Sequence, residues 1–169
     1  MKESADIRIE TATESDVPLI VSLIKELAAY ERLSDEVVMT EELLRTSLFG
    51  KCPSAEVIIG HYKETPVGFA VFFHNFSTFL GRRGLYLEDL FVRQEARGKG
   101  VGRALLLYLA RLAKERQCGR FEWAVLDWNE PATNFYKSLG ATPMNEWTIF
   151  RLTGDALDRL AARETISPS

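Results

Sequence analysis

The chain contains a glycine-rich run, Arg97-Gly98-Lys99-Gly100-Val101-Gly102, between two segments of contrasting pattern. The segment before it, residues 85–92, is almost continuously apolar and predicts a buried strand. The segment after it has apolar residues at helical spacing and predicts a helix from Gly100 to about Gln117. Glycines between a strand and a helix let backbone amides approach an anion at the positive end of the helix. The run therefore predicts a phosphate-binding turn, and a turn that uses glycine only for its geometry is the alternative.

Two other phosphate motifs do not fit this run. A P-loop requires Lys followed by Ser or Thr after its second glycine, and neither pair follows these glycines. The dinucleotide fingerprint G-x-G-x-x-G fails because Arg103 and Leu105 stand where its last glycine would be. The turn is therefore predicted to bind the phosphates of a different cofactor.

Further elements follow from the periodicity on either side of the run. Alternation predicts a strand at residues 7–11, and Thr13 with Asp16 resembles a capping box before an apolar helical stripe from Val17 to Ala28. The other predicted elements are a helix from Thr40, strands at 57–62, 67–73 and 121–125, a helix from Asn129 to Gly140, a strand at 148–152 and a helix at 155–162. The alternation of strands and helices in the second half indicates a mixed α/β sheet.

Length and charge restrict the class of protein. The 169 residues suit one domain, 1–169, and a net charge of −3 argues against a dedicated nucleic-acid binder. The sequence shows neither a signal peptide nor an apolar stretch of about 20 residues. The two cysteines, Cys52 and Cys118, lie far apart and form no zinc pattern with the two histidines. We therefore expect a cytoplasmic protein without a metal and without a nucleic-acid or membrane partner.

The glycine run is also part of a resemblance to a known family. Arg97-x-x-Gly100-x-Gly102 matches the [Q/R]-x-x-G-x-[G/A] signature of the GNAT N-acetyltransferases, whose turn holds the CoA pyrophosphate. Leu85-Tyr86-Leu87-Glu88-Asp89 and the segment from Asp127 to Lys137 resemble the spermidine/spermine and thialysine N-acetyltransferase branch. The resemblance covers nearly the whole chain. It implies an α/β (α+β) fold with a mixed, mostly antiparallel sheet of about six to seven strands, splayed between strands 4 and 5 and flanked by helices.

The resemblance also implies which residues bind acetyl-CoA as co-substrate. The strand before the turn is expected to pair with the pantetheine arm, the turn to hold the pyrophosphate, and the start of a later helix to line the thioester end. In that order, these residues are Leu90, Phe91 and Val92; Gly98, Lys99, Gly100, Val101, Gly102 and Arg103; and Asn129, Glu130, Pro131 and Ala132.

Two residues match the catalytic groups that the resemblance implies. Tyr136 corresponds to the catalytic tyrosine, and a phenol with a pKa of ~10 can donate a proton to the departing thiolate at neutral pH. Glu88 is the candidate to receive the proton of the attacking amine, directly or through water. Strict alternation along the strand places Tyr86, Glu88 and Leu90 on one face and Asp89 on the other. The alternatives are a core residue for Tyr136 and a solvated strand end for Glu88.

A cationic amine is expected to bind carboxylates, with aromatic side chains beside them. By the same resemblance these residues are Tyr30, Glu31, Glu122, Trp123 and Glu146, although Tyr30-Glu31 also fits a solvated helix end. The chain has Ser77-Thr78 where the polyamine enzymes carry an acidic residue. We therefore expect a small-molecule amine as substrate, namely a small diamine, a lysine-like amino acid or a polyamine. The alternatives are protein lysine or N-terminal amines, or a non-catalytic acyl-CoA-binding module. The branch also implies a homodimer.

Overall fold

The chain divides into two compact units, Met1–Ala124 and Val125–Ser169. The computed structural model describes residues 6–163 of the chain. Among these residues, no helix is both long enough and apolar enough to cross a membrane. The expectation of one domain over residues 1–169 stays a prediction.

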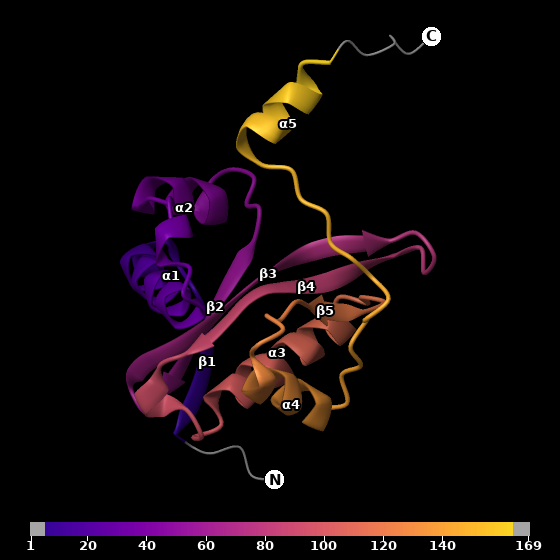
Figure 1. The fold of residues 1–169 in the computed structure, drawn as a ribbon. Helices are drawn as coiled ribbons and strands as arrows, with labels where there is room; N and C mark the ends of the chain where they lie inside the picture. Colours follow the sequence, from indigo (N-terminus) through magenta and orange to yellow (C-terminus); the bar gives the residue numbers. More distant parts are fainter. Residues whose placement is uncertain (1–5, 164–169) are drawn as a thin grey trace. The chain divides into compact units, whose positions relative to one another are not determined.

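The first unit is built on a five-stranded sheet with the order β1-β2-β3-β4-β5 (Figure 1). Its strands are β1 (Ile7–Thr11), β2 (Glu56–Tyr62), β3 (Thr65–Ser77), β4 (Arg82–Val92) and β5 (Phe121–Trp123). The first four are antiparallel neighbours, whereas β5 runs parallel to β4. The predicted mixed, mostly antiparallel sheet is therefore confirmed, and it has five strands among residues 6–163 rather than the six to seven predicted. Both β3 and β4 extend beyond their predicted bounds, because the mixed polar residues at the hairpin tip give no strand pattern.

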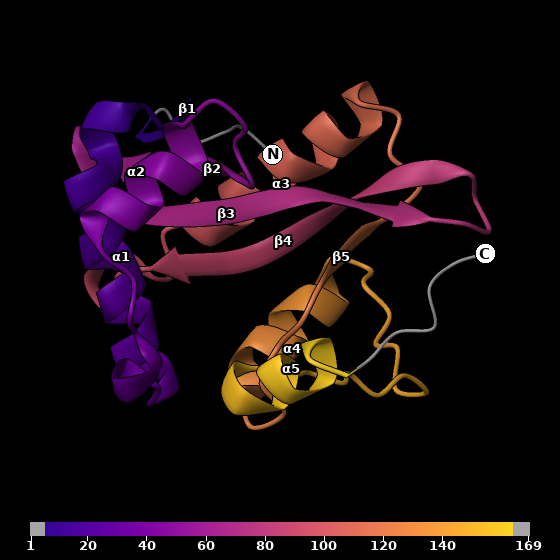
Figure 2. The ribbon, with the colours of Figure 1, turned by 90° about the horizontal axis from the view of Figure 1, so that it is seen from above.

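Helices cover both faces of this sheet (Figures 1 and 2). On one face lie α1 (Val17–Glu31) and α2 (Glu41–Phe49). Their apolar side chains pack with those of the sheet in a buried cluster, whose members include Ile20, Leu48 and Phe69. On the other face lies α3 (Val101–Glu115). A Cβ atom at Gly60 in β2 would come 2.8 Å from the Val101 side chain, so this glycine allows the close approach of α3.

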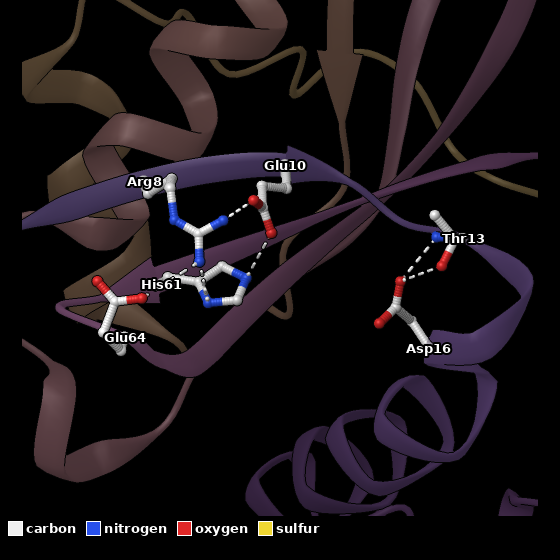
Figure 3. A network of polar contacts seen from close by, with 6 residues as sticks. All are labelled: Arg8, Glu10, Thr13, Asp16, His61 and Glu64. Carbon is white, nitrogen blue, oxygen red and sulfur yellow. Dashed lines mark hydrogen bonds and ion pairs between the residues drawn. The ribbon is translucent and has the colours of Figure 1, made fainter.

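The predicted helix starts are confirmed in detail. The backbone amide and the hydroxyl of Thr13 both donate to the Asp16 carboxylate, at 2.7 and 2.8 Å, in a short 3₁₀ turn before α1 (Figure 3). At α2, the Thr40 hydroxyl accepts a hydrogen bond from the Leu43 amide at 3.2 Å. Each contact satisfies polar groups that a helix start would otherwise leave unpaired.

A polar network joins β1 to β2 on the surface (Figure 3). Glu10 forms an ion pair with Arg8 and lies 3.2 Å from Nε2 of His61, while Nη2 of Arg8 lies 3.4 Å from the His61 Nδ1. Burial, assisted by the nearby Arg8 charge, lowers the pKa of His61. His61 is therefore neutral at physiological pH, and the network holds the edge strand by hydrogen bonds as well as by charge.

The second unit contains α4 (Glu130–Ser138) and α5 (Gly154–Ala161). The Asn129 side chain accepts a hydrogen bond from the Ala132 amide at 3.3 Å, and Gly140 after the helix has a φ of 89°. The predicted cap and stop of α4 are therefore confirmed, as is the helix predicted near residues 155–162. The strand predicted at residues 148–152 is wrong. This segment is irregular, and Ile149 and Phe150 are exposed, because a strand pattern forms a strand only where another strand pairs with it.

Candidate active site

The glycine-rich run forms a tight turn between β4 and α3. After a short 3₁₀ turn at Gln94–Ala96, Gly98 and Gly100 adopt left-handed φ values of 75° and 93°, and α3 begins at Val101. Side chains other than glycine are strained in this region. Gly102 lies inside α3, where an added Cβ atom would make only an ordinary contact, 3.7 Å from the Val92 side chain. Two of the three glycines are thus required by the backbone, and the third is not.

Two cationic side chains of the turn, Arg97 and Lys99, form cation–π contacts with tyrosine rings. The Arg97 guanidinium lies 4.3 Å from the centre of the Tyr30 ring, and its Nε donates to the Val92 carbonyl at 3.0 Å. The Lys99 ammonium lies 4.6 Å from the centre of the Tyr62 ring. Tyr30 lies in the last turn of α1 and Tyr62 ends β2, so these contacts connect the turn to both elements. No local pattern in the sequence indicates that Arg97 connects the turn to α1.

The sheet opens on one side of β4. Only Leu85, Tyr86 and Leu87 pair with β5, whereas Leu90, Phe91 and Val92 pair with β3 through Ala70, Phe69 and Gly68. Among the described residues, no strand pairs with the β5-facing edge of Leu90–Val92. This is the predicted opening between strands 4 and 5, and it leaves backbone groups that an extended ligand could pair with.

The prediction that strict alternation runs through Glu88 and Asp89 is wrong. Asp89 pairs with Val71 and Leu87 pairs with Phe72, so Glu88 is an extra residue in a β-bulge. The bulge interrupts the alternation and brings the two carboxylates into electrostatic contact. Glu88 itself is exposed to solvent.

Asp89 is the most perturbed carboxyl group in this region. Burial, followed by the charges of Glu88 and Glu31, raises the pKa of Asp89 to about 6. Burial also raises the pKa of Glu31 at the end of α1. The structure thus brings the predicted Glu31 and Glu88 together around Asp89, which was not among the predicted site residues. Two consecutive carboxylates in an apolar strand could have indicated Asp89 as a site residue. The assumption of strict alternation directed attention to Glu88 alone.

The predicted Glu122 and Trp123 lie on β5. Tyr86 pairs with Glu122 in the sheet, and the Glu122 charge is one cause of the raised pKa of Tyr86, after burial and Glu88. The Glu122 carboxylate already accepts from the Asn75 amide at 3.1 Å and lies 2.8 Å from Nε of Arg120. Trp123 packs edge-on against Phe121, with ring centres 4.9 Å apart. Glu122 is therefore a compensated carboxylate, unlike the group around Asp89.

Ser77 is engaged within the hairpin between β3 and β4. Its hydroxyl accepts a hydrogen bond from the Leu80 amide at 3.3 Å, and its side chain is buried. The contact stabilises the turn, as Ser hydroxyls commonly do. Ser77 is thus part of the hairpin structure at the position where the polyamine enzymes carry an acidic residue.

The other predicted site residues belong to the second unit. Asn129 caps α4, with Glu130, Pro131 and Ala132 in its first turn. Tyr136 lies in the same helix, with its ring centre 5.5 Å from that of Phe135. Glu146 is exposed in an irregular segment. The catalytic role of Tyr136 stays a prediction.

Comparisons with known proteins agree with this geometry. The model of the acetyltransferase (GNAT) family matches residues 22–141. The chain is 38% identical to thialysine N-epsilon-acetyltransferase of Sus scrofa, over 94% of this chain and 99% of the relative. It is 34% identical to L-ornithine N5-acetyltransferase of Arabidopsis thaliana, over 90% of this chain and 87% of the relative. The solved structure of an integron cassette protein from the mobile metagenome of V. cholerae superposes with a TM-score of 0.79 at 28% identity, covering 95% of this chain and all of that one.

Proposed function

The chain belongs to the GNAT family of acetyltransferases, and on this basis we propose that it transfers an acetyl group to the side-chain amine of a small, lysine-like amino acid. A small diamine is the next candidate. The observation that carries the proposal is the group of carboxylates formed by Glu31, Glu88 and Asp89, whose mutual repulsion a substrate ammonium would relieve. Two relatives support the substrate class, because their names specify acetylation of thialysine and of L-ornithine.

The family uses acetyl-CoA as co-substrate, and bound acetyl-CoA supplies the activated acetyl thioester. The shape of the turn supports binding of its pyrophosphate, because the left-handed Gly98 and Gly100 precede the positive end of α3. Lys99 and Arg103 add positive charge, and the amides of Val101 and Gly102 belong to the first helical turn. The free edge at Leu90–Val92 suits an extended arm, and Asn129–Ala132 would line the thioester end.

The proton transfers are assigned to three side chains. An alkylammonium group has an unperturbed pKa of ~10.4 and must lose a proton before it attacks a carbonyl carbon. Asp89 would hold the ammonium, and the exposed Glu88 beside it would pass the released proton to solvent. Tyr136 would donate a proton to the departing thiolate, with its ring oriented by Phe135.

A homodimer is part of the same proposal. In the second unit, Trp147, Ile149 and Phe150 are 73%, 76% and 92% exposed. Exposed apolar side chains this close in sequence are unusual for a monomer and suit an interface. Sedimentation velocity tests the dimer, and a monomer at micromolar concentrations contradicts it.

The activity is tested by measuring thiol release from acetyl-CoA with a panel of amines. The panel contains thialysine, lysine, ornithine, putrescine, spermidine and a lysine peptide at equal concentrations. We expect the largest kcat/KM for the amino acids with a short side-chain amine. Preference for spermidine or the peptide contradicts the substrate class, while acetyl-CoA binding without turnover of any amine contradicts the catalytic role itself.

A further inference from the structure

A cavity of about 640 Å³ lies in the first unit, where the β3–β4 hairpin meets the end of α3. Its lining residues include Phe76, Arg82, Arg83, Lys114, Arg116 and Cys118. The volume is in the range of small-molecule sites. Nothing in the proposed acetyl transfer uses this cavity.

The lining of the cavity is strongly basic. Four of its residues are Arg or Lys and none is acidic, although the whole chain has a net charge of −3. Arg116 is compensated, because its guanidinium is bound by both carboxylate oxygens of Glu56. Among the described residues, Arg82, Arg83 and Lys114 have no ion pair. The lining thus includes three cationic residues that form no ion pair in the described part of the chain.

The positive potential acts on a neighbouring group. His74 in β3 lies with its Nε2 3.5 Å from Nη1 of Arg116. Burial, followed by the charges of Arg116 and Arg83, lowers the pKa of His74, and only Glu56 opposes them. The pKa of His74 therefore responds to the charge in this cavity.

Neither the cofactor turn nor the helix dipole accounts for this cluster. The glycine turn is at the opposite end of α3, about 22 Å away at 1.5 Å per residue. Lys114 and Arg116 could complement the negative end of α3. Arg82 and Arg83, however, come from β4, so two separate elements direct cations to one place.

We propose that this cavity is a second ligand site, which binds the phosphoryl group of a small organic phosphate between Arg83 and Lys114. A dianionic phosphoryl group balances two uncompensated cations, whereas a carboxylate monoanion would balance one. Phe76, which is 62% exposed, provides an apolar wall for the organic part. The proposal is independent of the acetyl transfer.

The test is an NMR titration of the two histidines of the full chain with phenyl phosphate, without CoA, because the phosphate groups of CoA would compete for the cavity. Bound phosphate compensates Arg83, so we expect the pKa of His74 to rise while that of His61 stays unchanged. Benzoate has the same ring with a carboxylate and is expected to bind at least tenfold more weakly. An unchanged His74 titration overturns the proposal, and so does equal affinity for benzoate.

Two variants locate the site. Arg83→Gln should weaken phenyl phosphate binding about tenfold, the usual effect of removing a charged hydrogen-bond donor. Lys25→Gln removes the same charge from an exposed position on α1, over the opposite face of the sheet, and should bind normally. In a Cys52→Ser background, phenyl phosphate should also slow modification of Cys118 by a thiol reagent. Equal affinity of the two charge variants, or no protection of Cys118, contradicts the site.

Discussion

Arg97 and Tyr30 form a cation–π contact in which the guanidinium carbon lies 4.3 Å from the ring centre. Arg97 opens the glycine turn, whereas Tyr30 lies in the last turn of α1, immediately before its final residue, Glu31. The same guanidinium is held by the Val92 carbonyl at 3.0 Å. The contact therefore connects the end of the strand proposed to bind the pantetheine arm with the helix end proposed to bind the amine.

A double-mutant cycle measures this connection. We expect Arg97→Gln and Tyr30→Leu to be non-additive by ~0.5–1 kcal/mol in the free energy of unfolding, as is usual for an exposed cation–π pair. Urea denaturation of the four proteins gives the value. The matched control pairs Lys99→Gln with Tyr30→Leu, because Lys99 lies over Tyr62 instead. Additivity in both cycles shows that the Arg97–Tyr30 contact contributes nothing to stability.

The amine affinity is expected to depend on pH through Asp89. Its pKa of about 6 means that Asp89 is largely protonated below that pH and binds an ammonium poorly. KM for the amine should therefore fall as the pH rises through about 6, while the Kd of acetyl-CoA stays constant. Asp89→Asn should raise KM and remove this pH dependence. A variant that keeps the wild-type pH profile assigns the titration to another group.

Asp89 should also affect stability, with a sign that follows from its raised pKa. The folded state binds the proton more tightly than the unfolded state, whose carboxyl titrates near 3.8. The stabilisation from protonated Asp89 is therefore complete below about pH 4 and is lost as the pH rises through about 6. At pH 7.5 we expect Asp89→Asn to be more stable than the wild type by roughly 1–3 kcal/mol. Lower stability of the variant at both pH 4 and pH 7.5 indicates a structural role for this side chain.

The glycine turn and most elements were predictable because they depend on local patterns. Periodicity and capping residues predicted α1, α2, α3 and α4. The helices α1 and α3 each bury an apolar stripe, while α2 and α4 begin at side-chain caps, Thr40 and Asn129. The strand at residues 85–92 was predicted from its composition alone. Each of these features is determined by residues that are close together in the sequence.

Features that depend on a partner were not predictable. The bulge at Glu88 adds one residue to β4 relative to β3, which reverses the faces without any change of composition. Residues 148–152 have strand-like residues but no pairing strand in the described part of the chain. The contact of Arg97 with Tyr30 joins residues 67 positions apart, so no local pattern indicates it. The perturbed site residue Asp89 was missed for the same reason as the bulge.

Two alanine substitutions separate the structural and ligand-binding roles of the glycines. Gly100→Ala forces a side chain into a φ of 93°, only 3.4 Å from the Ile7 side chain, and should cost ~1–2 kcal/mol of unfolding free energy. Gly102→Ala lies within α3 and should leave stability unchanged or slightly higher. Loss of acetyl-CoA affinity in Gly102→Ala without loss of stability shows that Gly102 allows the close approach of a ligand. Normal acetyl-CoA affinity of Gly102→Ala shows that ligand binding does not require a glycine at this position.

Tyr136→Phe tests the proposed general acid. The variant removes only the hydroxyl, so the Phe135 contact and the helix should persist. We expect kcat to fall by about 10²- to 10⁴-fold, the usual contribution of a positioned acid, with the Kd of acetyl-CoA nearly unchanged. Tyr108→Phe in α3 makes the same change outside the proposed site and should keep full activity. Because loss of a proton donor matters most for a poor leaving group, a more acidic aryl thioester should restore part of the Tyr136→Phe rate. Unchanged turnover with acetyl-CoA removes Tyr136 from the chemistry and leaves the packing against Phe135 as its role.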